Sequence, residues 1–237
     1  MTLPSVSTIV IHDGNTTRLR CLRKPVKCNS METPDHISSL RIIGGNLALN
    51  FANTAEGTSE GEIEQEHLLG YEELVFWGYR VGYLSSEDGE RLLRKARERP
   101  ADADAVFARA LGFRGHLYGL FRAVAGGDNP PAESVEVLRR FESEAISRAA
   151  LAPTGGGFVW QWALGEDLAG VLWPVAHSAT ELLISGPLGR IKGCAGCNWL
   201  FVDESKNRSR RWCAMEDCGT NAKMRRYVAR RAAKRKS

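Results

Sequence analysis

The chain has 237 residues, of which 43% are hydrophobic and 25% are charged, an ordinary composition for a globular protein with a buried core. No apolar run approaches the roughly 20 residues that a membrane-spanning helix requires. The N-terminus lacks the basic, apolar and small-residue regions of a secretory signal. We therefore expect a cytoplasmic protein without a membrane partner.

The net charge of +4 is distributed unevenly along the chain. Residues 1–30 carry five Lys/Arg and one acid, residues 31–188 carry 13 basic and 23 acidic side chains, and residues 189–237 carry 14 basic and four acidic ones. An acidic body should avoid nucleic acid, whereas the basic C-terminal segment should attract it. The acidic body could also hold the basic tail until DNA or a ligand displaces it, although solubility is the simpler explanation.

The first 38 residues are rich in Ser, Thr and basic side chains and contain three prolines, so we expect a flexible basic leader over 1–38. Cys21 and Cys28 stand in it at a spacing that fits no common zinc pattern. Met31 is an alternative start of the protein.

Residues 39–188 are expected to form a mostly helical body. An apolar run at 47–54 is followed by an acidic, glycine-rich stretch at 55–66 that we expect to be a loop. Apolar periodicity predicts helices over 71–81, over about 102–125 and over 132–149. A further helix is expected after residue 85, where Ser85 and Asp88 can cap its start, and it should stop before Pro100.

Two further elements complete the body. The aromatic alternation at 158–162 is typical of a strand or hairpin. A helix is expected over about 166–185, and Pro174 should kink or split it. The predicted fold class is therefore mainly α with a short β hairpin in the body (α+β), followed by a small four-cysteine zinc finger at 189–237.

That finger is predicted from two cysteine pairs, Cys194-x2-Cys197 and Cys213-x4-Cys218. A loop of fifteen residues separates the pairs, and four thiolates can then surround one tetrahedral Zn²⁺. Four protein ligands leave no open position, so the one Zn²⁺ is expected to be structural. A redox dithiol pair or coincidence are the alternatives. Since no long linker precedes the finger, it should pack against the body.

Basic residues follow the first pair and the last cysteine. A helix is expected from Ala222 to about Ala233, with a narrow apolar seam of Met224, Tyr227 and Val228. Basic and amide side chains can bind phosphates and read base edges, so DNA is the expected partner. The candidate nucleic-acid-binding residues are Lys206, Asn207, Arg208, Ser209, Arg210, Arg211, Lys223, Arg225, Arg226, Arg230 and Arg231.

RNA is the alternative nucleic-acid partner. Trp199, Trp212 and Tyr227 could stack on unpaired bases if they are exposed, although Trp199 fits a core position better. Duplex DNA and single-stranded RNA should therefore be compared directly.

A second alternative places a small-molecule effector in the body. The candidate pocket residues are Asn50, Asn53 and Thr54, with His177 as a further possibility. The two asparagines equally fit a role in satisfying backbone groups, and His177 fits a satisfied core or surface position. No set of nucleophile, base and orienting group is present in the sequence, so we do not expect an enzyme.

The motifs resemble a known pair of domains. Cys194-Ala-Gly-Cys197, the stretch Phe201 to Met215 and Cys218-Gly219 resemble the CGNR-type zinc finger. Leu47 to Thr54, Trp77 to Leu84 and Trp160-x-Trp162 resemble the ABATE domain that commonly precedes that finger. Together the resemblance covers about residues 42–230.

This resemblance implies a bacterial, stress-related transcription regulator whose finger binds DNA. A single finger contacts few bases, so a homodimer or a partner protein would supply specificity. The chain departs from the naming motif, because it reads Cys218-Gly219-Thr220-Asn221 where the family has Cys-Gly-Asn-Arg. Arg225 or Arg226, one helical turn on, could replace the missing arginine.

Overall fold

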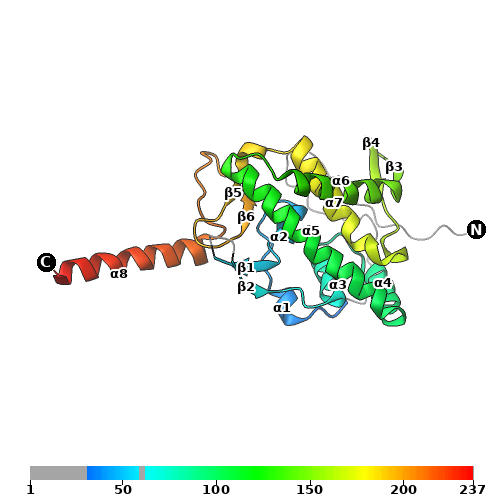
Figure 1. The fold of residues 1–237 in the computed structure, drawn as a ribbon, viewed down its shortest axis with the longest axis horizontal. Helices are drawn as coiled ribbons and strands as arrows, with labels where there is room; N and C mark the ends of the chain where they lie inside the picture. The colour runs from blue at the N-terminus through cyan, green and yellow to red at the C-terminus, as the bar shows by residue number, and fades with distance from the viewer. Residues whose placement is uncertain (1–30, 59–61, 237) are drawn as a thin grey trace, which may run out of the picture.

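The computed structural model describes residues 31–58 and 62–236. A helical body carries three small strand pairs, and one helix extends from it (Figure 1). The α-helices are α1 (Asp35–Ser38), α2 (Leu47–Ala52), α3 (Tyr71–Arg80), α4 (Ser86–Glu98), α5 (Pro100–Gly126), α6 (Ala132–Ser147), α7 (Trp173–Ile184) and α8 (Thr220–Lys236).

Shorter elements connect these helices. Each strand pair is antiparallel: β1 (Ala55–Gly57) with β2 (Ile63–Glu66), β3 (Ala150–Thr154) with β4 (Gly157–Gln161), and β5 (Ile191–Gly193) with β6 (Leu200–Val202). Three 3₁₀ turns and one π-type turn complete the described chain: η1 (Leu164–Glu166), η2 (Leu168–Leu172), η3 (Leu188–Arg190) and the π turn η4 (Met215–Gly219). The predicted class, mainly α with small β elements, is confirmed.

Local signals place the helices of the body. The Ser85 hydroxyl accepts a hydrogen bond from the Asp88 N–H at 3.0 Å and caps α4 as predicted. The long α5 begins at Pro100 and ends at Gly127, which has a φ of 81° in the left-handed region that glycine favours. In Figure 1, α5 crosses the body from the finger to α4.

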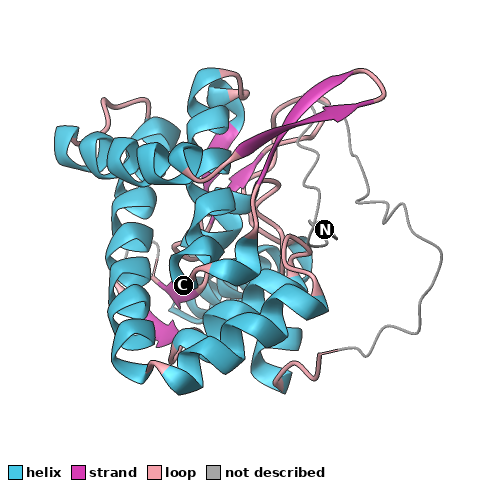
Figure 2. Ribbon diagram, turned by 90° about the vertical axis from the view of Figure 1, so that its right-hand side faces the viewer, coloured by secondary structure: helices cyan, strands magenta, loops and turns pink. Residues whose placement is uncertain are grey.

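Pro174 splits the expected helix at 166–185. It lies in the first turn of α7, where its missing N–H needs no partner, and the residues before it form η1 and η2 instead. The predicted hairpin is β3–β4, which extends away from the helices (Figure 2). Its side chains Phe158 and Leu151 are 70% and 59% exposed.

Three expectations need correction. Ala55–Gly57 and Ile63–Glu66, within the stretch expected to be a loop, form the antiparallel strands β1 and β2, and the Gly57 N–H of β1 also donates to Asn198 Oδ1. The folded chain starts earlier than residue 39, since Met31 and Ile37 are buried and α1 lies before that boundary. The C-terminal helix begins at Thr220 rather than Ala222, as a direct continuation of η4. The prediction for residues 1–30, including Cys21 and Cys28, falls outside the described residues.

One hydrophobic core joins the body and the finger. Within this core the Phe51 ring packs at a tilt against Trp77 and Phe113, with ring centroids 5.3 and 6.4 Å away. Leu200 and Phe201 of β6 are fully buried in the same cluster. The finger therefore closes one side of the body core, as the absence of a linker predicted. Among the described residues, no helix is both long and apolar enough to cross a membrane.

Candidate metal centre and nucleic-acid surface

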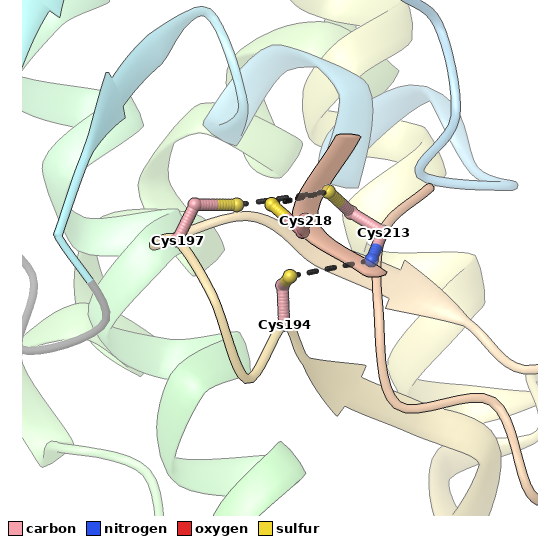
Figure 3. A group of neighbouring side chains, drawn as sticks. All are labelled: Cys194, Cys197, Cys213 and Cys218. Atoms are coloured by element: carbon pink, nitrogen blue, oxygen red, sulfur yellow. Dashed lines mark hydrogen bonds between the residues drawn. The ribbon is translucent and has the colours of Figure 1, made fainter. Parts of the chain in front are cut away.

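The four clustered cysteines come from two arms of the finger. Cys194 and Cys197 lie in the turn between β5 and β6, and the Cys194 N–H donates to the Trp199 carbonyl at 2.8 Å to close that turn. Cys213 follows the long loop, and Cys218 lies in η4. Figure 3 shows the four sulfurs facing one another between the two arms.

The sulfur geometry fits a tetrahedral metal site. The four Sγ atoms all lie within 4.8 Å of one another. Cys197 Sγ is 3.6 Å from Cys213 Sγ, which is 3.7 Å from Cys218 Sγ. A tetrahedral ion with metal–sulfur bonds of about 2.3 Å separates its ligands by about 3.8 Å. The Cys197–Cys213 and Cys213–Cys218 separations thus match a four-thiolate site, and all four sulfurs lie close enough together to share one ion.

The backbone supports the thiolate form of the ligands. Cys194 Sγ accepts hydrogen bonds from the N–H groups of Cys213 at 3.3 Å and Gly196 at 3.4 Å. Hydrogen bonds from the neighbouring Cys197 and Cys213 thiols, together with these N–H groups, lower the pKa of Cys194. Cys194, Cys197 and Cys213 are buried and Cys218 is half-buried, so bulk water has little access.

A buried carboxylate shapes the loop between the two arms. Asp203 is fully buried, and its oxygens accept from Lys192 Nζ at 2.6 Å, the Ser205 N–H at 2.9 Å and the Arg210 N–H at 3.0 Å. Burial alone would raise the pKa of Asp203, but these donors hold it well below its ordinary value. Lys192 Nζ also donates to the Arg208 carbonyl. Asp203 was not among the predicted site residues, although an Asp two residues before a Ser is a signal for such a turn.

Comparison with known protein families shows to which family the chain belongs. Residues 45–186 match the ABATE family, whose description is "Putative stress-induced transcription regulator", and this is more than half of the chain. The chain belongs to the ABATE family. Residues 190–231 match the CGNR zinc finger. No curated protein matches the chain.

In this ABATE protein the C-terminal helix stands apart from the body. α8 continues η4, and in Figure 1 it projects beyond the finger into solvent. Every side chain from Lys223 to Arg231 is exposed, including the predicted apolar seam. The acidic body therefore does not hold the basic tail in this structure, contrary to that expectation. The exposed set includes the predicted Lys223, Arg225, Arg226, Arg230 and Arg231.

The candidate nucleic-acid-binding residues of the finger loop divide into two groups. Lys206, Asn207, Arg208, Ser209 and Arg211 are exposed. Arg210 is half-buried, and its guanidinium lies 4.2 Å from the Phe201 ring and donates to the carbonyls of Trp212 and Cys213. Arg210 therefore braces the third metal ligand, a role that its place in a basic run did not indicate.

The ABATE body adds one arginine to the basic side of the finger. A cleft of about 680 Å³ separates the end of α5 from the finger, and its lining includes Arg122 of α5 and Lys192, Arg210 and Arg211 of the finger. Sequence reasoning missed Arg122, because nothing in the pattern of α5 indicates that its end meets the finger.

The aromatic residues proposed for base stacking are mostly covered. Trp199 is 3% exposed and lies in the core, as the sequence favoured, while Trp212 is half-buried. Tyr227 is 54% exposed, and the Arg231 guanidinium lies 5.6 Å from its ring. Of the three, only Tyr227 presents a largely free ring.

The residues proposed as a ligand pocket are engaged with the chain itself. Asn50 Oδ1 accepts from the Gly44 N–H at 2.7 Å. Asn53 is 3% exposed, and its amide binds both backbone groups of Leu200. These residues satisfy buried backbone groups, which corrects the pocket hypothesis in favour of its alternative.

Thr54 is fully buried and belongs to a polar cluster below β1. Its hydroxyl donates to the Phe51 carbonyl at 2.7 Å and accepts from Arg114 Nη1 at 3.1 Å. Arg114 also forms a two-point ion pair with Glu66. Burial alone would raise the pKa of Glu66, but the hydrogen bonds from Arg114 lower it below its ordinary value. Thr54 therefore helps to hold β2 against α5.

His177 is a buried residue of α7. Its Nδ1 lies 2.9 Å from Glu142 Oε1, and its ring centroid is 5.5 Å from that of Trp162. The histidine is thus a satisfied core residue, in keeping with the sequence reasoning.

Proposed function

We propose that this ABATE protein is a cytoplasmic DNA-binding transcription regulator, and that α8 and the finger loop form its DNA-binding surface. One observation carries the proposal. The fourth cysteine ligand lies in the turn that continues directly into α8. α8 contains eight Lys/Arg and no Asp or Glu. The metal site thus fixes the origin and direction of a strongly basic helix.

We propose that the bound ion is a single structural Zn²⁺. Four thiolates at tetrahedral spacing are typical of structural zinc. When bound, the ion supplies a fixed junction between the two arms. Because four protein ligands leave no position for substrate, the proposed role is binding and not catalysis.

The dimensions of α8 suit the major groove. Its 17 residues span about 25 Å at about 1.5 Å per residue, and the major groove of about 12 Å width admits a helix. Basic side chains lie on several faces of α8, so some can bind phosphates on both sides of the groove while others face the bases. Lys206, Arg208 and Arg211 extend this surface along the loop.

Duplex DNA is favoured over single-stranded RNA. Base stacking requires exposed rings, and burial of Trp199 and half-burial of Trp212 leave Tyr227 as the main candidate. The basic side chains of α8 can contact both phosphate backbones that flank the major groove of duplex DNA. Single-stranded RNA therefore serves as the competitor in the test.

Fluorescence anisotropy of the full chain with labelled duplex DNA over a salt series tests the proposal. With six to eight phosphate contacts, log K should fall with log salt at a slope of about −5 to −7. The double substitution Arg225→Ala and Arg226→Ala should reduce the steepness by about 2. The matched control is Arg94→Ala with Arg97→Ala on α4, which removes the same charge from exposed positions of the body.

Two results would contradict the proposal. A slope near zero would show that α8 makes no phosphate contacts. Displacement of the duplex by an equal concentration of single-stranded RNA would move the function to RNA. We also expect a homodimer on DNA, because one finger contacts few base pairs. Sedimentation velocity of the complex measures its stoichiometry.

A further inference from the structure

An open groove lies between α6 and α7, on the ABATE body and separate from the finger. Its volume is about 640 Å³, within the range of about 300–1,000 Å³ that is usual for small-molecule sites. Val135 is 46% exposed and Ile184 is 75% exposed at its walls. The apolar lining residues are Val135, Leu138, Ile146, Leu183 and Ile184.

Glu142 supplies an unusual polar atom in this groove. It is one of the lining residues, and its Oε1 lies 2.9 Å from His177 Nδ1. The second oxygen, Oε2, is buried and has no hydrogen-bond partner among the described residues. A buried carboxylate oxygen without a donor is costly, so most such oxygens in folded proteins have a partner.

The other polar groups of the groove leave this oxygen without a donor. The Ser143, Ser147 and Thr180 hydroxyls each donate to a backbone carbonyl of their own helix, at 2.8, 2.7 and 3.2 Å. A hydroxyl has one proton to donate. Arg139 donates through Nε and Nη2 to Glu136, both at 2.7 Å. The groove therefore offers apolar walls and one acceptor that a ligand could satisfy.

The net negative charge of the body favours a positively charged ligand in this groove. Residues 31–188 carry 13 basic and 23 acidic side chains, so the body attracts cations. An ammonium group donates up to three hydrogen bonds and would neutralise Glu142, whereas a carboxylate would be repelled. A ligand with an apolar body and an amine end thus matches both the walls and the free oxygen.

We propose that the α6–α7 groove binds a small lipophilic amine. The apolar part lies against Leu138, Ile146 and Leu183, and rotation of the Glu142 carboxylate brings its buried Oε2 to the groove, where the protonated amine donates to it. This site is separate from the metal centre and from α8. It would give the proposed regulator a binding site for an effector with an apolar part and an amine.

Isothermal titration calorimetry of the full chain at pH 7 tests this inference with n-octylamine, n-octanol and octanoate as probes. Octylamine should bind at one site per chain, at least tenfold more tightly than octanol, and octanoate should not bind. Glu142→Gln should weaken octylamine binding at least tenfold. The matched control is Glu133→Gln, an exposed position in the first turn of α6.

A second variant keeps the test valid if Glu142→Gln does not fold, which circular dichroism would reveal. Ser143→Trp fills the groove from an exposed position and should abolish octylamine binding. Equal affinity for octylamine and octanol would overturn the amine assignment. Unchanged binding by Ser143→Trp, or no saturable binding of any probe, would overturn the site itself.

Discussion

The side-chain amide of Asn53 pairs with the backbone of Leu200 in both directions. Asn53 Nδ2 donates to the Leu200 carbonyl, and the Leu200 N–H donates to Asn53 Oδ1, each at 2.8 Å. A residue at the end of α2 thereby acts as a strand neighbour for β6. In the opposite sense, the finger residue Asn198 binds the backbone of the body, because its Oδ1 accepts from the Gly57 N–H at 3.0 Å. Two asparagines thus join body and finger through hydrogen bonds that resemble a sheet.

Asn53→Ala should destabilise the chain by about 2–6 kcal/mol, because the N–H and the carbonyl of Leu200 would both be buried without partners, at about 1–3 kcal/mol each. Urea unfolding measures this loss. Asn207→Ala, in the exposed finger loop, is the matched control and should change stability by less than about 0.5 kcal/mol. A loss as small as that of the control would show that the Asn53 pairing contributes little.

Gly57→Ala should disrupt the β1–β2 hairpin and its junction with Asn198. A Cβ at Gly57 would lie 1.7 Å from the Glu62 carbonyl oxygen, a backbone atom that cannot rotate away. We expect a lower midpoint of thermal unfolding than for the wild type. Gly155→Ala, where a Cβ would have no neighbour within 4 Å, is the control. Equal midpoints for both variants would mean that the hairpin can shift at no cost.

Metal removal should destabilise the body as well as the finger. Binding free energies of structural Zn²⁺ sites are about 10–16 kcal/mol, and here β6 lies in the shared core. Calorimetry with and without a chelator should show one transition that moves to a lower temperature. Elemental analysis should find one zinc ion per chain.

Cysteine substitutions test the same site. Cys213→Ser, at the buried third ligand, should reduce the metal content, whereas Cys21→Ser and Cys28→Ser should leave it at one ion per chain. Metal loss from the latter pair would contradict the assignment of the four ligands. A finger transition separate from the body would contradict the shared core.

Asp203→Asn should destabilise the finger at neutral pH, and the difference from the wild type should shrink in acid. The pKa of Asp203 is depressed in the folded chain, so its contribution is present above the unfolded pKa of about 3.9 and is lost as the pH falls through the lower folded value. Unfolding of both proteins at pH 7, 5 and 3 measures it. Metal content is measured at each pH, because loss of the metal would abolish the difference without any titration of Asp203. A constant difference at all three pH values would be inconsistent with an ionised Asp203.

Arg210→Ala should lower metal affinity, whereas Arg208→Ala should not. The Arg210 guanidinium donates to the carbonyls beside Cys213 and covers Phe201, while the Arg208 side chain is exposed. Competition with a chromogenic zinc chelator compares the two variants, which remove the same charge. Equal effects of both would show that Arg210 acts only through its charge.

Local sequence signals predicted most helices of the body. Ser85 as the cap of α4 and Pro100 as the limit of that helix act within a few residues, so their effect is visible in the sequence. Cysteine spacing likewise predicted a cluster that the structure brings within 4.8 Å. These features require no knowledge of distant contacts.

Features that depend on distant partners were not predictable in the same way. β1 appears as part of a charged loop, because the acceptor of its Gly57 N–H, Asn198 Oδ1, lies 141 residues away along the chain. Asn53 looked like a ligand-binding residue for the same reason, since its partner Leu200 is equally remote. Asp203 stands in a polar run, and its burial becomes evident only when Lys192 and the loop fold over it.

The insertion of Leu200 and Phe201 into the body core has a consequence for the life of the protein in the cell. A chain without its metal would expose part of that core and become a target for proteases. Metal supply would then govern how many intact molecules of this protein persist, independently of what each molecule binds.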